Sequence, residues 1–150
     1  MGGRGSGGNR RNTQNPQDKI AERLEQIRNQ EYQYHATLGT SIFSIYEQGL
    51  KPNRGHAGRG VYFAPEEQAA LDWTASSSTG GTTLLRVRTK TLKDKYSWGV
   101  LDESESTADK KISSKDIEIK LKGSENSWMK LSDYVQKRQT SYKMWKAKKE

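Results

Sequence analysis

The residues best suited to binding a nucleotide are concentrated in the stretch 34–73. This stretch contains the imidazole of His35, the phenol of Tyr62 and the indole of Trp73. An imidazole can hydrogen-bond a sugar hydroxyl, and aromatic rings can stack on a flat heterocycle. The segment 51–60, KPNRGHAGRG, is rich in glycine, which lets the backbone approach a ligand closely. We therefore interpret the stretch as a nucleotide pocket.

Short elements must position these groups. Tyr32 and Tyr34 have strand spacing, so His35 is expected on the opposite face, at the end of a strand. Residues 40–48 have apolar side chains at helical spacing, and Gly49 suits the left-handed conformation that ends a helix. The sequence predicts a strand followed by a short helix.

The second half of the stretch predicts a loop, a strand and a helix. We expect the segment 51–60 to be an exposed loop, in which Gly58 and Gly60 are the candidates for close approach to a ligand. Residues 61–63 are typical of a buried strand. A helix is expected to begin near Pro65 and to contain Trp73.

Three motifs in this stretch resemble the ADP-ribosyltransferase superfamily, in the His-Tyr-Glu branch that includes poly-ADP-ribose polymerases and diphtheria-type toxins. YHAT resembles the first-strand motif His-Gly-Thr/Ser, SIYEQGLKP is similar to the helix followed by Gly-Leu, and GRGVYFA resembles the Gly-x-Gly-Ile-Tyr-Phe strand. The resemblance implies an α+β fold of two small, mostly antiparallel sheets packed face to face. Short helices would flank the sheets, and NAD would bind between them.

The resemblance also implies roles for individual residues, with NAD as the donor of ADP-ribose. His35 would hydrogen-bond a ribose hydroxyl, the backbone of Ala36 would hold the nicotinamide carboxamide, and Tyr62 would stack on the nicotinamide ring. Trp73 would form the other aromatic wall. The expected NAD-binding set is His35, Ala36, Thr37, Gly60, Tyr62 and Trp73. Ala36 replaces the usual glycine, which narrows the room beside the backbone contacts.

A carboxylate should complete the catalytic set with His35 and Tyr62. Transfer of ADP-ribose passes through a transition state like an oxocarbenium ion, which a carboxylate near the ribose stabilises. The acidic run VLDESESTADKK offers Glu103 and Glu105. The spacing in toxin-type members favours Glu105, and the spacing in the polymerase branch favours Glu103, so both stay open. The alternative interpretation of the run is a solvated acidic turn.

Composition limits the classes of protein. A chain of 150 residues is long enough for one domain, and we expect a flexible Gly/Arg-rich linker at 1–14 before a domain at 15–150. The absence of cysteine excludes disulfides and thiolate metal sites, and with only two histidines we expect no metal. The sequence contains no apolar run long enough to span a bilayer and no export signal, so we expect a soluble chain.

Other segments should support the pocket. Asn15 and Pro16 fit the start of a helix whose apolar face packs on the domain. Residues 84–88 alternate as a strand with two arginines on one face, and another strand should contain residues 117–121, including Glu118, a third option for the acid. The segment 127–150 is expected to be a helix with a basic end.

The net charge of +8 indicates an anionic partner. Since RNA 2'-phosphotransferases show a similar order of motifs, structured RNA is a credible acceptor, and a protein acceptor is equally open. The composition resembles the C-terminal toxin portion of a larger bacterial delivery protein, which would carry it into a target-cell cytoplasm. Such a toxin implies an acidic immunity protein. The alternatives are an NAD glycohydrolase, an RNA 2'-phosphotransferase-like enzyme and a non-catalytic module that binds nucleic acid or ADP-ribose.

Overall fold

The computed structural model describes residues 15–75, 81–122 and 127–149, so the expected linker at 1–14 lies outside the described residues. The helices are α2 (Pro16–Asn29), α3 (Ile42–Gln48), α4 (Glu67–Ala75), α5 (Thr89–Lys95), α6 (Leu131–Gln136) and α7 (Gln139–Lys149), with 3-10 turns η1 (Gly39–Ser41) and η2 (Ser114–Asp116). The strands are β1 (Tyr32–Leu38), β2 (Asn53–Gly55), β3 (Gly58–Phe63), β4 (Thr82–Arg88), β5 (Trp98–Asp102), β6 (Glu105–Ala108), β7 (Glu118–Lys120) and β8 (Trp128–Lys130).

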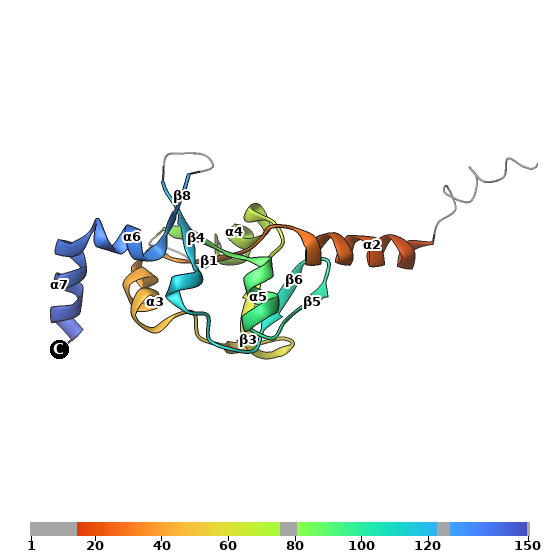
Figure 1. Cartoon of the computed structure of the whole chain (residues 1–150), viewed down its shortest axis with the longest axis horizontal. Coiled ribbons are helices and arrows are strands. Elements are labelled where there is room, and N and C mark those ends of the chain that lie inside the picture. Colours follow the sequence, from red (N-terminus) through yellow and green to blue (C-terminus); the bar gives the residue numbers. More distant parts are fainter. Residues whose placement is uncertain (1–14, 76–80, 123–126, 150) are drawn as a thin grey trace, which may run out of the picture.

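The described chain is α+β, with two small antiparallel sheets and several helices, as expected. The first sheet has the strand order β1-β4-β7-β8, and the second has the order β2-β3-β6-β5. Each neighbouring pair is antiparallel. Figure 1 shows both sheets in the centre of the molecule, with helices around them.

The two sheets share one core, and a backbone bridge joins them. Tyr34 of β1 and Ala64, just after β3, exchange both backbone hydrogen bonds, at 2.9 and 2.8 Å. Phe63 and Leu85 are fully buried, one from each sheet. The main core cluster contains Ile42, Ile45, Leu50, Val61, Phe63, Leu85, Val87, Leu92, Tyr96, Ala108, Ile112, Ile117, Ile119, Leu131 and Val135. Burial of these side chains supplies most of the stabilisation of a fold without disulfides.

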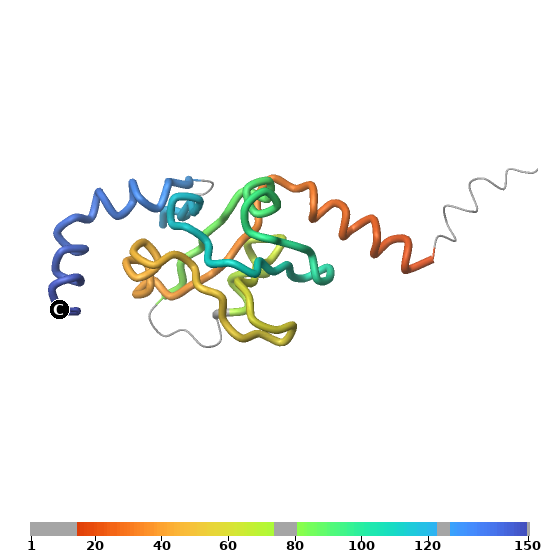
Figure 2. Tube along the Cα trace, turned by 60° about the horizontal axis from the view of Figure 1, so that its bottom comes forward, coloured from red at the N-terminus to blue at the C-terminus, as the bar shows by residue number. Residues whose placement is uncertain are grey.

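The helix α2 forms as predicted but does not pack as expected. Asn15 caps it, with Oδ1 accepting from the N–H of Asp18 at 2.9 Å. Only Ile27 is buried, whereas Ile20 is 41% exposed, and Figures 1 and 2 show the helix projecting away from the sheets. The capping signal therefore predicted the helix, and the apolar stripe did not predict its packing.

Three expectations about element boundaries are corrected. His35 lies inside β1 rather than at its end, because the strand continues to Leu38 by pairing with β4. The segment 51–60 is not a loop throughout, since β2 and β3 form a hairpin there. The terminal segment is not one helix, because β8 pairs with β7 before α6 and α7 follow. In each case strand pairing overrides the local pattern.

Candidate active site

His35 lies where the two sheets separate. In an antiparallel ladder hydrogen-bonded pairs recur at every second residue, so the pair after Tyr34 and Ala64 would be Ala36 and Tyr62. Instead the carbonyl oxygen of Tyr62 lies 2.8 Å from Nδ1 of His35. Since a carbonyl only accepts, Nδ1 carries the proton, and Nε2 is left as an acceptor. The imidazole thus takes the place of the backbone N–H of Ala36 as the partner of the Tyr62 carbonyl.

This separation leaves a backbone edge of β1 open. The N–H and C=O of Tyr34 face β3, and those of Ala36 face the same side, because backbone groups two residues apart in a strand point the same way. Among the described residues no hydrogen bond joins Ala36 to β3. The Ala36 methyl group packs with the small cluster around Ala64 and Leu84. The Ala36 methyl group therefore does not occupy the edge that faces β3.

An open pocket of about 300 Å³ lies beside His35. That volume is at the lower end for small-molecule sites. The lining is mostly polar and includes one cation, Lys51. The lining residues are His35, Thr37, Ser41, Ser44, Ile45, Gln48, Gly49, Leu50, Lys51 and Asn53. Thr37, expected to bind NAD, thus lies in the same pocket as His35.

Tyr62 braces the turn of the β2–β3 hairpin. Its hydroxyl donates to the carbonyl of Gly58 at 2.6 Å and accepts from the N–H of Ala57 at 3.2 Å. Its ring occupies the space that a side chain at Gly55 would need. Gly58 and Gly60 are required for different reasons. Gly58 has a φ of 105°, which side chains disfavour, and Gly60 lies so close to the side chain of Thr107 that a Cβ atom would not fit.

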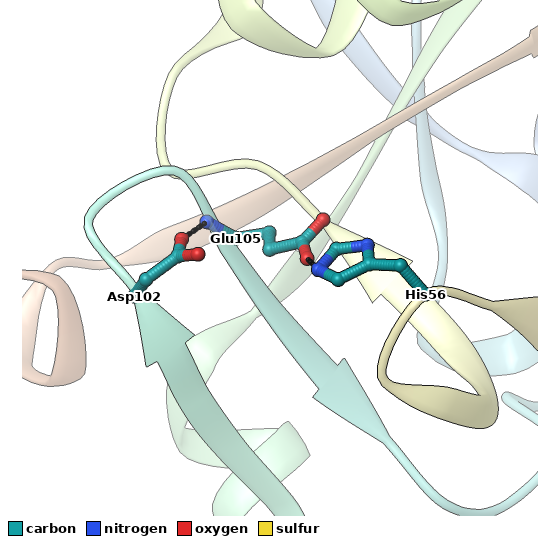
Figure 3. A group of neighbouring side chains, drawn as sticks. All are labelled: His56, Asp102 and Glu105. Carbon is teal, nitrogen blue, oxygen red and sulfur yellow. Dashed lines mark hydrogen bonds and ion pairs between the residues drawn. The ribbon is translucent and has the colours of Figure 1, made fainter.

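Glu105 begins β6, the strand that pairs with β3 (Figure 3). The Oδ1 atom of Asp102 accepts from the N–H of Glu105 at 3.0 Å and from the N–H and hydroxyl of Ser104, each at 2.8 Å. The Glu105 carboxylate is buried, and Nε2 of His56 lies 2.5 Å from its Oε1. This contact is an ion pair by distance, but Oε1 has no aligned hydrogen-bond donor among the described residues.

Burial shifts both main ionisable groups of the site toward their neutral forms. Burial lowers the pKa of His35, and the hydrogen bond to the Tyr62 carbonyl only partly opposes this. Burial also raises the pKa of Glu105, His56 lowers it, and Asp102 raises it. Hydrogen bonds, first from the backbone N–H of Ser104, lower the pKa of Asp102.

The cluster of His56, Asp102 and Glu105 has ligand-type atoms within 4.8 Å of one another. Two ligands of one zinc ion are separated by about 3 Å or more, given metal–ligand bonds of about 2.0–2.2 Å. The 2.5 Å contact between His56 and Glu105 is shorter than that. The geometry is that of an ion pair, and we assign it no metal role.

Of the predicted site residues, His35 and Thr37 line the pocket, and the others do not: Ala36, Gly60, Tyr62, Trp73, Glu103 and Glu105. Trp73 is 45% exposed on α4, and α4 packs with Tyr34 and Ala36, on the face of β1 opposite His35. The position of the pocket thus gives no support to a second aromatic wall at Trp73. Glu103 is exposed in the turn between β5 and β6, whereas Glu105 is buried.

The third candidate acid, Glu118, is engaged elsewhere. Its Oε1 accepts from Nε of Arg86 at 2.6 Å. The Arg86 guanidinium also lies 3.6 Å from the ring centre of Tyr32 and 4.2 Å from that of Trp128. Glu118 therefore neutralises an arginine that is packed between two aromatic rings, on a part of the first sheet away from the pocket lining.

Sequence reasoning missed His56, for which only a metal role was considered and rejected. It also missed the polar groups of Ser41, Ser44 and Gln48 that line the pocket. The helical spacing of residues 40–48 predicted which face of this helix is buried. The polar side chains on its other face were the available signal that this segment could line a pocket. No local signal pairs His56 with Glu105, because a turn and a strand distant in sequence meet only in the fold.

Among the described residues no helix has the length and apolar character needed to cross a membrane. Comparison of the chain with models of known protein families and with curated proteins finds no match.

Proposed function

We propose that this chain is an NAD-dependent ADP-ribosyltransferase of the His-Tyr-Glu type. The observation that carries the proposal is that His35, Tyr62 and Glu105 come from β1, β3 and β6, and that β3 adjoins both of the other strands. A pocket of suitable polarity opens beside His35. The ADP-ribosyltransferase fold itself is part of this proposal.

The donor would be gripped at the edge of β1. The open N–H and C=O of Ala36 match the acceptor and donor of a nicotinamide carboxamide. Because Nδ1 of His35 is held by the Tyr62 carbonyl, Nε2 is free to accept a hydrogen bond from a ribose hydroxyl. Lys51 in the pocket lining offers a positive charge to the pyrophosphate.

Glu105 is the carboxylate that fits the reaction best. As the bond between the nicotinamide nitrogen and the ribose carbon breaks, its electron pair leaves with nicotinamide and positive charge develops on the ribose. An ionised carboxylate in a poorly solvated site stabilises that charge more strongly than an exposed one. Glu105 is buried and adjoins β3, whereas Glu103 is exposed.

We favour RNA as the acceptor because of the positive charge of α7. Between residues 137 and 149 the chain has six cations and no acid, with Lys143, Lys148 and Lys149 exposed. The helix packs against α3 through Tyr142 and Trp145, each in ring contact with Phe43. Because α3 also lines the pocket, phosphates bound along α7 would bring RNA toward the donor site. A protein acceptor is the second outcome of the test below.

The decisive experiment incubates the domain with NAD labelled in its ADP-ribose part, and with total RNA or total protein. We expect release of nicotinamide and label on RNA, both lost in Glu105→Gln and kept in Lys93→Ser, a control at an exposed position of α5. Label on protein would correct the acceptor, and release without label would indicate a glycohydrolase. RNA binding without nicotinamide release would overturn the enzyme and favour the binding module.

We further propose that the domain is a toxin, delivered by a larger carrier and neutralised by an acidic immunity protein. Its production in bacterial cytosol should arrest growth. His35→Ala, Tyr62→Ala and Glu105→Ala should each relieve the arrest. Normal growth with the unaltered domain, at comparable protein levels, would count against the toxin.

A further inference from the structure

The exposed side chain of His56 contacts the buried carboxylate of Glu105. The His56 side chain is 70% exposed and that of Glu105 is 10% exposed, yet Nε2 and Oε1 are 2.5 Å apart. Surface histidines ordinarily remain solvated, and buried carboxylates require a partner. Figure 3 shows the two side chains reaching toward each other from the hairpin turn and from the start of β6.

The turn that holds His56 is fixed on both sides. Gly55 precedes it and lies against the ring of Tyr62, which leaves no room for a side chain there. Ala57 and Gly58 follow it and are both hydrogen-bonded to the Tyr62 hydroxyl. The rings of His56 and Tyr62 have centres 6.0 Å apart. The position of the imidazole is therefore set by the same tyrosine that is proposed to stack on nicotinamide.

Glu105 is fixed from the opposite side. Asp102 accepts from the backbone N–H of Glu105 and so holds the start of β6. The Oε1 atom of Glu105 is buried and has no aligned hydrogen-bond donor in the described part of the chain. His56 is thus the positively ionisable group that the structure places against this oxygen.

We propose that His56 is a positioning residue for Glu105, which aims the carboxylate and keeps it ionised for the reaction. The proposal rests on the proposed function, since the reaction is that of the same site. It adds a fourth member to the set, contributed by a segment that would otherwise be only a hairpin turn. His56 acts on Glu105, and it need not touch the substrate.

The ionisable groups that face Glu105 determine the expected effect. They are His56 from the hairpin turn and Asp102 from β5. The hydroxyl of Tyr62, on β3, is hydrogen-bonded to the hairpin turn instead. Burial and Asp102 raise the pKa of Glu105, and His56 opposes them. Removing the imidazole leaves both raising effects, so the carboxyl should hold its proton to a higher pH.

The first test needs no substrate. In protein labelled with carbon-13 at glutamate side-chain carboxyls, Glu105→Gln identifies the Glu105 signal, which is then followed against pH by NMR. We expect His56→Ala to raise the pKa of Glu105 by about one unit. His56→Gln, which keeps an N–H donor without the charge, should raise it less, and Lys93→Ser, at an exposed position of α5, should leave it unchanged. An unchanged pKa in His56→Ala would overturn the proposal.

The second test measures nicotinamide release against pH. The acidic limb of the profile should move upward by about one pH unit in His56→Ala, so that release falls about tenfold at the foot of that limb and changes little on the plateau. A purely structural role would lower release equally at all pH values, which would overturn the proposal. If NAD is not turned over at all, the proposed function fails while the NMR titration still decides the His56–Glu105 pair.

Discussion

The chain contains two histidines, and the two regions that hold them treat the imidazole in opposite ways. His35 is half-buried where the sheets separate and faces a backbone carbonyl, so burial lowers its pKa and the hydrogen bond fixes its tautomer. His56 is exposed at the tip of a hairpin and faces a carboxylate. A half-buried imidazole bonded to a carbonyl can serve as a neutral hydrogen-bonding group, whereas an exposed imidazole beside an acid can lower the pKa of that acid.

The largest expected effect is on the carboxylate that His56 contacts. Glu105→Gln should lower nicotinamide release by about 10²–10³-fold, because it removes the charge that we propose stabilises the transition state. Glu103→Gln should stay within about threefold, since an exposed side chain is screened by water. Steady-state measurement of nicotinamide release compares the two. If Glu103→Gln lowered release more than Glu105→Gln, Glu103 would replace Glu105 as the proposed catalytic acid, and the proposed positioning role of His56 would be lost.

The next effect separates the two histidines directly. His35→Ala should lower kcat/KM for NAD by about 10–100-fold at every pH, because it removes the proposed hydrogen bond to ribose and the group that holds the Tyr62 carbonyl. His56→Ala should approach wild-type activity at alkaline pH. The comparison requires kcat and KM at several pH values. Equal, pH-independent losses in both variants would show that the two histidines do the same thing.

The His35 region was much more predictable from sequence than the His56 region. The cap at Asn15 and the stop at Gly49, which has a φ of 76°, are local signals, and both predicted ends are confirmed. The contact between His35 and Tyr62 spans 27 residues and was not predicted by any local pattern. Local backbone preferences and short-range pairing are what a single sequence expresses best.

What could not be predicted depends on distant pairing. The hairpin of β2 and β3 has a polar, glycine-rich sequence, and only the pairing of Val61 with Ala108 and its neighbours places His56 near Glu105. Trp128 has helical spacing with Leu131, yet it belongs to β8 because β7 pairs with it. The exposure of Ile20 shows the same limit, since periodicity describes a face without saying what covers it.

A backbone prediction sharpens the contrast further. Gly60→Ala should destabilise the domain by about 1–3 kcal/mol, because the added methyl group would overlap Oγ1 of Thr107 on β6. Gly99→Ala on β5 is the matched control, since a methyl group there meets no atom within 4 Å. Urea unfolding measures both variants. Gly60→Ala combined with Thr107→Ala should recover part of the loss, and equal stabilities of the two single variants would contradict the close approach of β3 to β6.

The smallest expected effect concerns stability alone and isolates His35. Its pKa in the folded protein is lowered below the ordinary value of 6.5, so the unfolded chain binds the proton more tightly. The free energy of unfolding should therefore be undiminished above about pH 6.5 and should fall as the pH decreases toward the folded-state pKa, by about 1.4 kcal/mol for each unit of lowering. In His35→Asn, whose amide can still donate to the Tyr62 carbonyl, this decrease should disappear. Urea unfolding at pH 7, 6 and 5 measures it, and His56→Ala should retain the decrease. A parallel decrease in wild type and His35→Asn would mean that the imidazole of His35 is hydrated and charged like a surface histidine, and the contrast between the two regions would be lost.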